Sequence, residues 1–342
     1  MCNKLMDMDH KELSKDSRYR IGIDLGGTKI KLGVVDENNE IVDRMSIPTL
    51  VNRSYQEIIQ SMAEGVITLL EGTDINLKQC DFLGIGSPGV IDGKTGTVVY
   101  SNNFAWENIP VVEELQKYID LPMYISNDAN CAVLGEAAAG AATDCDNIVL
   151  LTLGTGIGSG IILNGKLFEG SNIGGSEYGH SVLVVDGEQC TCGRRGCFEA
   201  YASATALIRE TKKAAKRNEN SILHLLCGSD LTKVCGVTPF KAMEYGDPSA
   251  KEVIDNYIKY LGNGIINLIN LFRPDKVLIS GGICNQGDNL LKPVNDYVAK
   301  HCFGGSYTYI PAIIKAALGN TAGIIGAASL QNYLYIEQDV SM

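Results

Sequence analysis

One histidine and three cysteines stand close together at spacings typical of a metal site. They are His180, Cys190, Cys192 and Cys197, in the pattern H-x9-C-x-C-x4-C. Zinc takes four nitrogen and sulfur ligands in tetrahedral geometry, and this set supplies one imidazole and three thiolates. Because four protein ligands leave no open position, the pattern predicts a structural zinc ion and not one that activates water. The alternative is a chance cluster of reduced cysteines.

Two glycine-rich turns could hold the phosphates of a nucleotide. The first lies within the sequence Asp24-Leu25-Gly26-Gly27-Thr28-Lys29, and a shift of 127 residues places Gly27 on Gly154 and Thr28 on Thr155. Adjacent glycines let backbone N–H groups approach an anion closely. A carboxylate at the end of the preceding strand, Asp24, could hold Mg²⁺ through water. The alternative is two ordinary hairpins, but the echo favours two related lobes that clamp one polyphosphate.

A third candidate lies where a strand ends and a helix begins, at Asn127-Asp128. Ligands of α/β proteins collect at such strand ends. The helix dipole would help to keep the Asp128 carboxylate ionised and able to accept a proton. Taken alone, however, the pair is better explained as a plain helix N-cap.

The elements that must position these residues alternate between strands and helices, which is typical of α/β folding in two lobes. Apolar periodicity and turn signals predict a helix that starts in a capping box at Ser54 and ends at Gly72. The strand–turn–strand segments are predicted at 20–35 and 147–167, further strands at 41–47, 81–86, 122–125 and 276–280, and further helices from 110, at 128–139 and at 249–272.

The composition excludes several classes of protein. The chain has 342 residues with 40 acidic and 29 basic side chains, a net charge of −11. This balance argues against binding to nucleic acid or to an anionic membrane, since both need a basic surface. The odd total of eleven cysteines, most of them isolated, favours a reducing compartment. No apolar segment marks the first 20 residues, so we expect a soluble, cytoplasmic protein.

Taken together, the motifs resemble those of the ROK family (repressors, open reading frames and sugar kinases) and, within it, the bacterial ATP-dependent glucokinases. The resemblance runs from about residue 20 to 330. These glucokinases often carry Gly-Gly-Glu where this chain has Gly174-Gly175-Ser176-Glu177. The motifs that carry the resemblance are Asp24-x-Gly-Gly-Thr-Lys29, Gly86-x-Pro-Gly89, Asn127-Asp-Ala-Asn130, Leu153-Gly-Thr-Gly-Ile-Gly158, Glu177-x-x-His180 and Cys190-Thr-Cys-Gly-x-x-Gly-Cys197-x-Glu199.

The resemblance implies a two-lobed actin-like ATPase (ribonuclease H-like) fold, which agrees with the duplicated hairpins. We expect a flexible tail at 1–19, a small lobe at 20–139 and a large lobe at 140–317 with a zinc loop at 180–197. A C-terminal helix at about 318–335 is expected to pack back on the small lobe. The family also implies a homodimer that transfers the γ-phosphoryl group of Mg-ATP to the 6-hydroxyl of glucose.

The same resemblance implies roles for individual residues. Asp128 would be the general base, and His180 would bind zinc through one ring nitrogen and a sugar hydroxyl through the other. The residues implied to bind the sugar are Gly89, Asn103, Asn127, Asp128, Glu177, His180 and Glu199. Those implied to bind the nucleotide and its Mg²⁺ are Asp24, Gly26, Gly27, Thr28, Lys29, Gly154, Thr155, Gly156, Gly281 and Gly282.

Three alternatives remain open. Relatives with the same constellation phosphorylate mannose, fructose, allose or N-acetylated hexosamines. Other members are sugar-responsive repressors, but only about 19 residues precede the first strand here and the net charge is −11. A chaperone-type or cytoskeletal ATPase would share the two turns without needing Asp128, His180 or the cysteine cluster.

Overall fold

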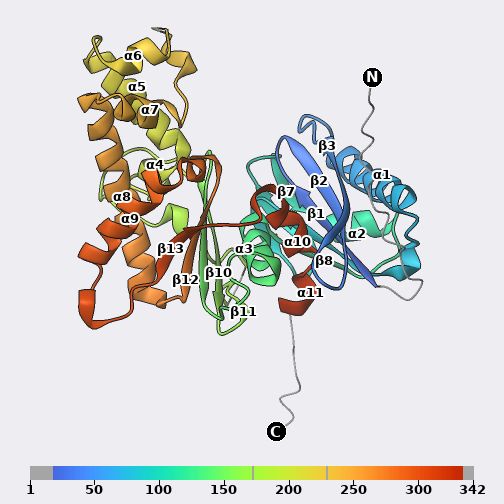
Figure 1. Cartoon of the computed structure of the whole chain (residues 1–342). Helices are drawn as coiled ribbons and strands as arrows, with labels where there is room; N and C mark the ends of the chain where they lie inside the picture. Colours follow the sequence, from blue (N-terminus) through green and yellow to red (C-terminus); the bar gives the residue numbers. More distant parts are fainter. Residues whose placement is uncertain (1–17, 172, 229, 334–342) are drawn as a thin grey trace, which may run out of the picture.

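The computed structural model describes residues 18–171, 173–228 and 230–333. Two lobes lie side by side, with helices between their sheets (Figure 1). The first strand begins at Tyr19, and the preceding residue Arg18 bonds the Asp81 carboxylate through Nε at 2.6 Å. The rest of the predicted tail, residues 1–17, lies outside the described residues.

The first lobe is built on a five-stranded sheet in the order β3-β2-β1-β4-β8. Strand β1 pairs antiparallel with β2 and parallel with β4, while β2–β3 is antiparallel and β4–β8 is parallel. A small antiparallel sheet of β5, β6 and β7 follows β4. The bounds are β1 Tyr19–Leu25, β2 Lys29–Val35, β3 Ile41–Pro48, β4 Cys80–Ser87, β5 Val90–Asp92, β6 Thr97–Ser101, β7 Trp106–Ile109 and β8 Met123–Asn127.

The second lobe repeats this topology. Its sheet has the order β11-β10-β9-β12-β13, again with two antiparallel pairings followed by two parallel ones. The similarity between the two glycine-rich hairpins therefore extends to two whole sheets, which confirms the prediction of two related lobes. The bounds are β9 Ile148–Leu153, β10 Ile157–Leu163, β11 Lys166–Leu167, β12 Lys276–Ser280 and β13 Ala312–Lys315.

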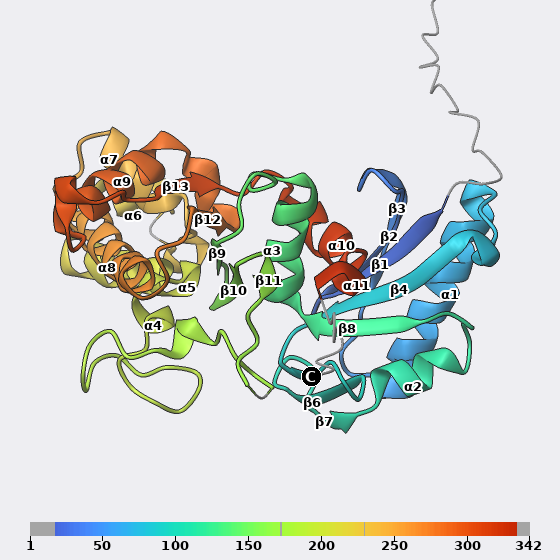
Figure 2. The same cartoon turned by 90° about the horizontal axis from the view of Figure 1, so that it is seen from below.

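The last strand of each five-stranded sheet leads into a helix that packs against the other sheet. Helix α3 (Asp128–Ala139) follows β8 and contacts β9 and β10, whereas α10 (Ala322–Ala327) follows β13 and contacts β1 and β4. Figure 2 shows α3 between the two sheets, beside α10. The helices approach so closely that a Cβ on Gly326 would lie 1.6 Å from the Cys131 carbonyl oxygen, so a side chain there would clash with the backbone. Glycine at this position makes the contact possible.

Of the remaining helices, α1 packs on β2 and β3, α2 on β8 and α9 on β13, whereas α5 and α7 pack on α8. The capping box predicted at Ser54 is present at the start of α1, which continues past Gly72 and ends at Asp74 in the left-handed conformation. The C-terminal helix predicted at 318–335 is instead a 3₁₀ turn at Gly319–Thr321 followed by α10 and by α11 (Leu330–Tyr333); residues 334–335 lie outside the described residues. The other helices are α1 Tyr55–Thr73, α2 Val111–Gln116, α4 Glu199–Ala202, α5 Ala204–Arg217, α6 Ile222–Leu226, α7 Thr238–Glu244, α8 Pro248–Phe272 and α9 Asp288–His301.

The long helix α8 supplies much of the core of the second lobe. Val253, Ile254, Tyr257, Leu261 and Ile265 are buried in one apolar cluster with strands of the second sheet. This is the stripe expected from the helical spacing of apolar residues. Among the described residues, no helix is both long and apolar enough to cross a membrane.

A buried carboxylate holds together the two chain segments that cross between the lobes. Glu136, near the end of α3, is fully buried. Its Oε2 accepts hydrogen bonds from the backbone N–H groups of Ala141 and Ala317, each at 2.9 Å, and its Oε1 accepts one from Leu318 at 2.7 Å. The segment after α3 and the segment before α10 are thereby joined through one side chain.

We predict that Glu136→Ala lowers the free energy of unfolding by about 3 kcal/mol, because three backbone donors lose a charged acceptor. Urea unfolding measures this change, with Glu71→Ala on the exposed face of α1 as the control. A loss below about 1 kcal/mol, within the range of an ordinary surface substitution, would contradict the role of Glu136.

Candidate functional site

The carboxylate of Asp128 stands at the start of α3, where the first sheet meets the second lobe. Its Oδ1 accepts a hydrogen bond from the N–H of Ala129 at 2.9 Å, while Asn127 is the N-cap and accepts from the same N–H at 2.8 Å. The side chain is open to solvent, yet protein surrounds it on most sides. Burial by this surrounding protein, together with the nearby charges of Asp24 and Glu177, raises the pKa of Asp128 to about 6. The hydrogen bond from Ala129 acts in the opposite direction.

A second carboxylate, Asp24, lies close enough to Asp128 to influence its charge. It is the second-last residue of β1 and forms an ion pair with Lys31 of β2, with 2.8 Å between Oδ2 and Nζ. The two residues are directly opposite each other in the antiparallel register, so their side chains share one face of the sheet. The structure therefore places one cation and two carboxylates together at the carboxyl end of β1.

The first glycine-rich turn joins β1 to β2 in the first sheet. The N–H of Gly26 donates to the Lys29 carbonyl at 3.1 Å, and the hydroxyl of Thr49 donates to the Gly26 carbonyl at 2.6 Å. Thr28 and Lys29 are exposed, and a Cβ on Gly27 would lie 3.5 Å from Nδ2 of Asn103. The turn therefore lies beside Asn103, which was predicted to contact the sugar.

The second turn and the predicted adenosine site are neighbours. The N–H of Gly154 donates to the Gly156 carbonyl at 3.0 Å, and Gly154 and Thr155 are exposed. Gly281 has a φ of 106°, and a Cβ there would lie 2.2 Å from the Leu153 carbonyl oxygen, so only glycine fits. Gly281 and the exposed Gly282 thus lie against the strand that leads into Gly154.

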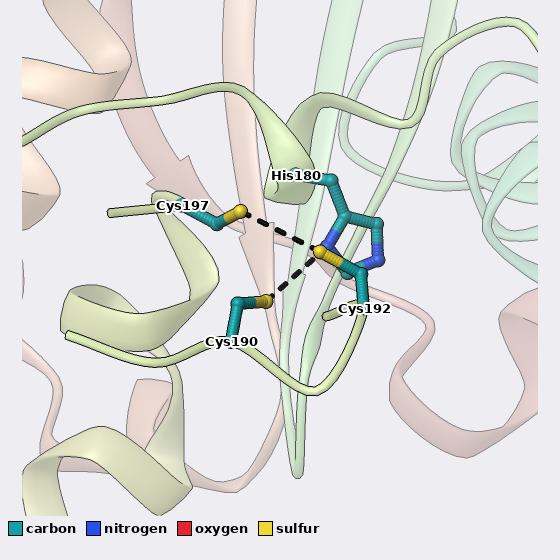
Figure 3. A group of neighbouring side chains, drawn as sticks. All are labelled: His180, Cys190, Cys192 and Cys197. Atoms are coloured by element: carbon teal, nitrogen blue, oxygen red, sulfur yellow. Dashed lines mark hydrogen bonds between the residues drawn. The ribbon is translucent and has the colours of Figure 1, made fainter. Parts of the chain in front are cut away.

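The four predicted metal ligands come together. The ligand atoms of His180, Cys190, Cys192 and Cys197 all lie within 4.8 Å of one another, and Figure 3 shows them pointing toward a common centre. Sγ of Cys192 lies 3.7 Å from Sγ of Cys197, and Sγ of Cys190 lies 3.6 Å from Nδ1 of His180. Tetrahedral zinc with bonds of about 2.3 Å to sulfur and about 2.1 Å to nitrogen gives edges of about 3.8 and 3.6 Å.

The chemistry of this donor set also fits a cation. Burial and the neighbouring thiols raise the pKa of Cys197 to about 12, and burial raises that of Cys190. Three adjacent thiolates therefore need a positive charge at their centre. In this structure Nδ1 of His180 faces the sulfurs, which leaves Nε2 for another partner. The set could hold a zinc ion.

A cavity of about 830 Å³ lies among residues that were predicted to bind the sugar. It contains three of the residues predicted to bind sugar, Gly89, Asn127 and Glu177, and Nδ2 of Asn127 donates to the Gly89 carbonyl at 3.1 Å. Burial raises the pKa of Glu177. The charge of His180 lowers this pKa, and the charge of Glu199 raises it. The other lining residues are Ile91, Asp92, Gly93, Lys94, Tyr124, Asn130, Glu169, Gly170, Ser171, Ile173, Gly174, Gly175 and Gln331.

Glu199, which was predicted to contact the sugar, connects the cysteine loop to the second turn. Its Oε1 accepts from the Thr191 hydroxyl at 2.9 Å, and its Oε2 accepts from the N–H of Ile157 at 2.9 Å. A Cβ on Gly156 would lie 2.2 Å from Oε2. Both carboxylate oxygens of Glu199 therefore have protein partners in this structure.

Two residues near the site, Lys31 and Glu169, were not predicted from the sequence. Lys31 could have been found, because a hairpin that turns at Gly26–Thr28 pairs position 24 with position 31. Glu169 could not, because its partners Ser126 and Asn130 lie 43 and 39 residues away in sequence, across the interface between the lobes.

Comparisons with known proteins agree with this geometry. Among curated proteins, the chain is similar to a glucokinase from Thermotoga maritima, with 38% identity over 314 residues that make up 91% of this chain and 96% of that enzyme. It is also similar to the xylose repressor of Bacillus subtilis, with 28% identity over 323 residues, covering 93% of this chain and 78% of the repressor.

Among solved structures, the chain is similar to a ROK family glucokinase from Streptomyces griseus in complex with glucose and AMPPNP. The TM-score is 0.78 and the identity 33%, and the match covers 91% of this chain and 98% of that one. The model of the ROK family matches residues 20–333. With the duplicated actin-like lobes and the motifs in place, the chain belongs to the ROK family.

Proposed function

We propose that the chain is an ATP-dependent sugar kinase that transfers the γ-phosphoryl group of ATP to the 6-hydroxyl of glucose, with Asp128 as the general base. The glucokinases are 34–38% identical to this chain and the xylose repressors 26–28%, which favours the kinase over the regulator. The observation that carries the mechanism is the exposed Asp128 carboxylate, whose pKa is raised to about 6 and whose neighbour in sequence, Asn127, lines the cavity.

Asp128 suits the removal of a proton from an alcohol. A general base works best when its pKa lies near the operating pH, because it is then ionised but still basic. An ordinary aspartate is a weaker base by about two pKa units. The Ala129 N–H at 2.9 Å fixes Oδ1, so Oδ2 is the oxygen that we propose for the sugar hydroxyl.

The two glycine-rich turns and Asp24 suit the phosphate chain of ATP. Backbone N–H groups of both turns can hold phosphate oxygens from opposite lobes. Asp24 can hold Mg²⁺ through water, and Mg²⁺ would neutralise the developing charge on the phosphates. Lys31 already balances Asp24, so the carboxylate does not stand as an uncompensated charge. We propose that Gly281 and Gly282 face the adenosine.

The cavity presents the amide and carboxylate groups that a ring of hydroxyls requires. We propose that Gly89, Asn103, Asn127, Glu177 and His180 hold the sugar, since hydroxyls both donate and accept hydrogen bonds. We propose that Glu199 also accepts from a sugar hydroxyl, since each carboxylate oxygen can accept a second hydrogen bond beside that from Thr191 or Ile157. Mannose, fructose, allose and N-acetylated hexosamines remain the alternative substrates.

We further propose that zinc binds His180, Cys190, Cys192 and Cys197 and fixes the orientation of the His180 ring. With Nδ1 on the metal side, Nε2 would face a sugar hydroxyl. Because oxidation of the thiolates would release the metal, we place the chain in a reducing compartment such as the cytoplasm. The homodimer implied by the family also remains a proposal.

The pH dependence of glucose phosphorylation tests the role of Asp128. The carboxyl must lose its proton to act as a base, so kcat/KM should fall about tenfold per pH unit below pH about 6.

Asp128→Asn cannot accept the proton, and we predict a loss of at least ~10²–10⁴-fold in kcat. A coupled ADP-release assay measures both quantities, and glucose binding by calorimetry checks that the variant keeps its site. Near-wild-type turnover of Asp128→Asn would remove Asp128 from the mechanism.

Elemental analysis tests the metal site. We predict about one zinc ion per chain in purified protein, because the four donors fit a closed tetrahedron. Cys192→Ser should lose the metal and weaken sugar use more than ATP use, since it frees the ring of His180. Cys235→Ser, at an exposed cysteine outside the group, is the matched control. An active preparation without metal would contradict the zinc site. If Cys192→Ser weakened sugar use and ATP use equally, the role of the site would be limited to stabilising the fold.

A further inference from the structure

Glu169 belongs to the second lobe but bonds residues of the first. It follows β11, two residues beyond Leu167, and begins the segment that leads to Glu177. Its Oε1 accepts hydrogen bonds from the Ser126 hydroxyl at 2.8 Å and from Nδ2 of Asn130 at 3.1 Å. Glu169 also lines the cavity of about 830 Å³.

The two partners of Glu169 lie on either side of the proposed base. Ser126 is the second-last residue of β8, and Asn130 lies in the first turn of α3, so they flank Asn127 and Asp128 in sequence. Ser126 and Asn130 are 1% and 4% exposed and bond each other at 3.2 Å. Because water scarcely reaches these groups, loss of the carboxylate would leave buried donors without an acceptor.

The backbone of Glu169 fixes the segment that carries Glu177. The Glu169 carbonyl accepts from the N–H of Gly175 at 3.1 Å, and a Cβ on Gly175 would lie 2.3 Å from that carbonyl. The hydroxyl of Ser176 donates to the Phe168 carbonyl at 2.8 Å. Glu177 follows Ser176 directly and lines the cavity. These two hydrogen bonds therefore link the position of Glu169 to that of Glu177.

We infer that Glu169 is a positioning residue that sets Glu177 and its loop against the start of α3, at the distance from Asp128 that a hexose requires. The inference rests on the proposed function. Glu169 bonds Ser126 and Asn130 on either side of Asp128, so we assign it an action on the sugar through the groups that it positions. A carboxylate suits the place because two donors converge on one oxygen and the start of a helix favours negative charge.

Steady-state kinetics of Glu169→Ala and Glu169→Gln, with glucose and ATP varied separately, tests this inference. Glutamine keeps a carbonyl oxygen for Ser126 and Asn130, so E169Q should keep its KM for glucose within about twofold. E169A removes the acceptor and should raise the KM for glucose by about tenfold or more, with a smaller change in kcat. The KM for ATP should stay within about twofold, because the two glycine-rich turns are held by other residues. Glu219→Ala, at an exposed site between α5 and α6, is the control.

Calorimetric binding of glucose without ATP provides a second readout that does not depend on turnover. E169A should weaken glucose binding, and the losses of E169A and N130A should be less than additive in E169A/N130A, since both changes break the contact between Glu169 and Asn130. An unchanged KM for glucose in E169A, or an equal rise for both substrates, would overturn the inference. If E169A does not fold, Asn130→Ala, which removes one donor, must raise the KM for glucose selectively. Wild-type protein that phosphorylates no hexose would instead refute the proposed function.

Discussion

The packing of α3 between the two sheets is the constraint on which the rest of the structure depends. Its first residue is Asp128, and its last turns carry the buried Glu136. Both ends are fixed by groups from both lobes, through Glu169 at the start and through Ala317 and Leu318 at the end. Any relative movement of the lobes must therefore act on the helix that carries the proposed base. Phosphoryl transfer depends mainly on positioning and charge stabilisation, so this arrangement suits it.

Charge distribution separates the two halves of the cleft. On the side that we propose for the nucleotide, Lys31 balances Asp24 beside the first glycine-rich turn. On the side that we propose for the sugar, burial and neighbouring carboxylates raise the pKa of Asp128 and that of Glu177. A neutral, hydroxyl-rich substrate fits the second environment and a polyanion fits the first, because acidic groups repel phosphates but accept hydrogen bonds from hydroxyls.

Local features of the site were predictable from sequence, whereas contacts across the lobes were not. The metal ligands, the two turns and the N-cap at Asn127 depend on residues within about 20 positions of one another, so their spacing carries the information. The repeat also indicated two related lobes. The exchange of α3 and α10 between the sheets and the contacts of Glu169 depend on how the lobes dock, which residue spacing does not encode. The orientation of Glu199 depends on a contact inside the second lobe with Ile157, 42 residues away in sequence.

Phosphorylation of a panel of hexoses tests the central claim, that this cleft is built for glucose and acts at its 6-hydroxyl. ADP release should be measured with glucose, mannose, fructose, allose and N-acetylated hexosamines under identical conditions, and the phosphorylated carbon should be identified by NMR. The account predicts the highest kcat/KM for glucose and a product phosphorylated at the 6-position. Preference for another hexose would contradict the assignment of glucose, and no ADP release with any sugar would contradict the kinase itself.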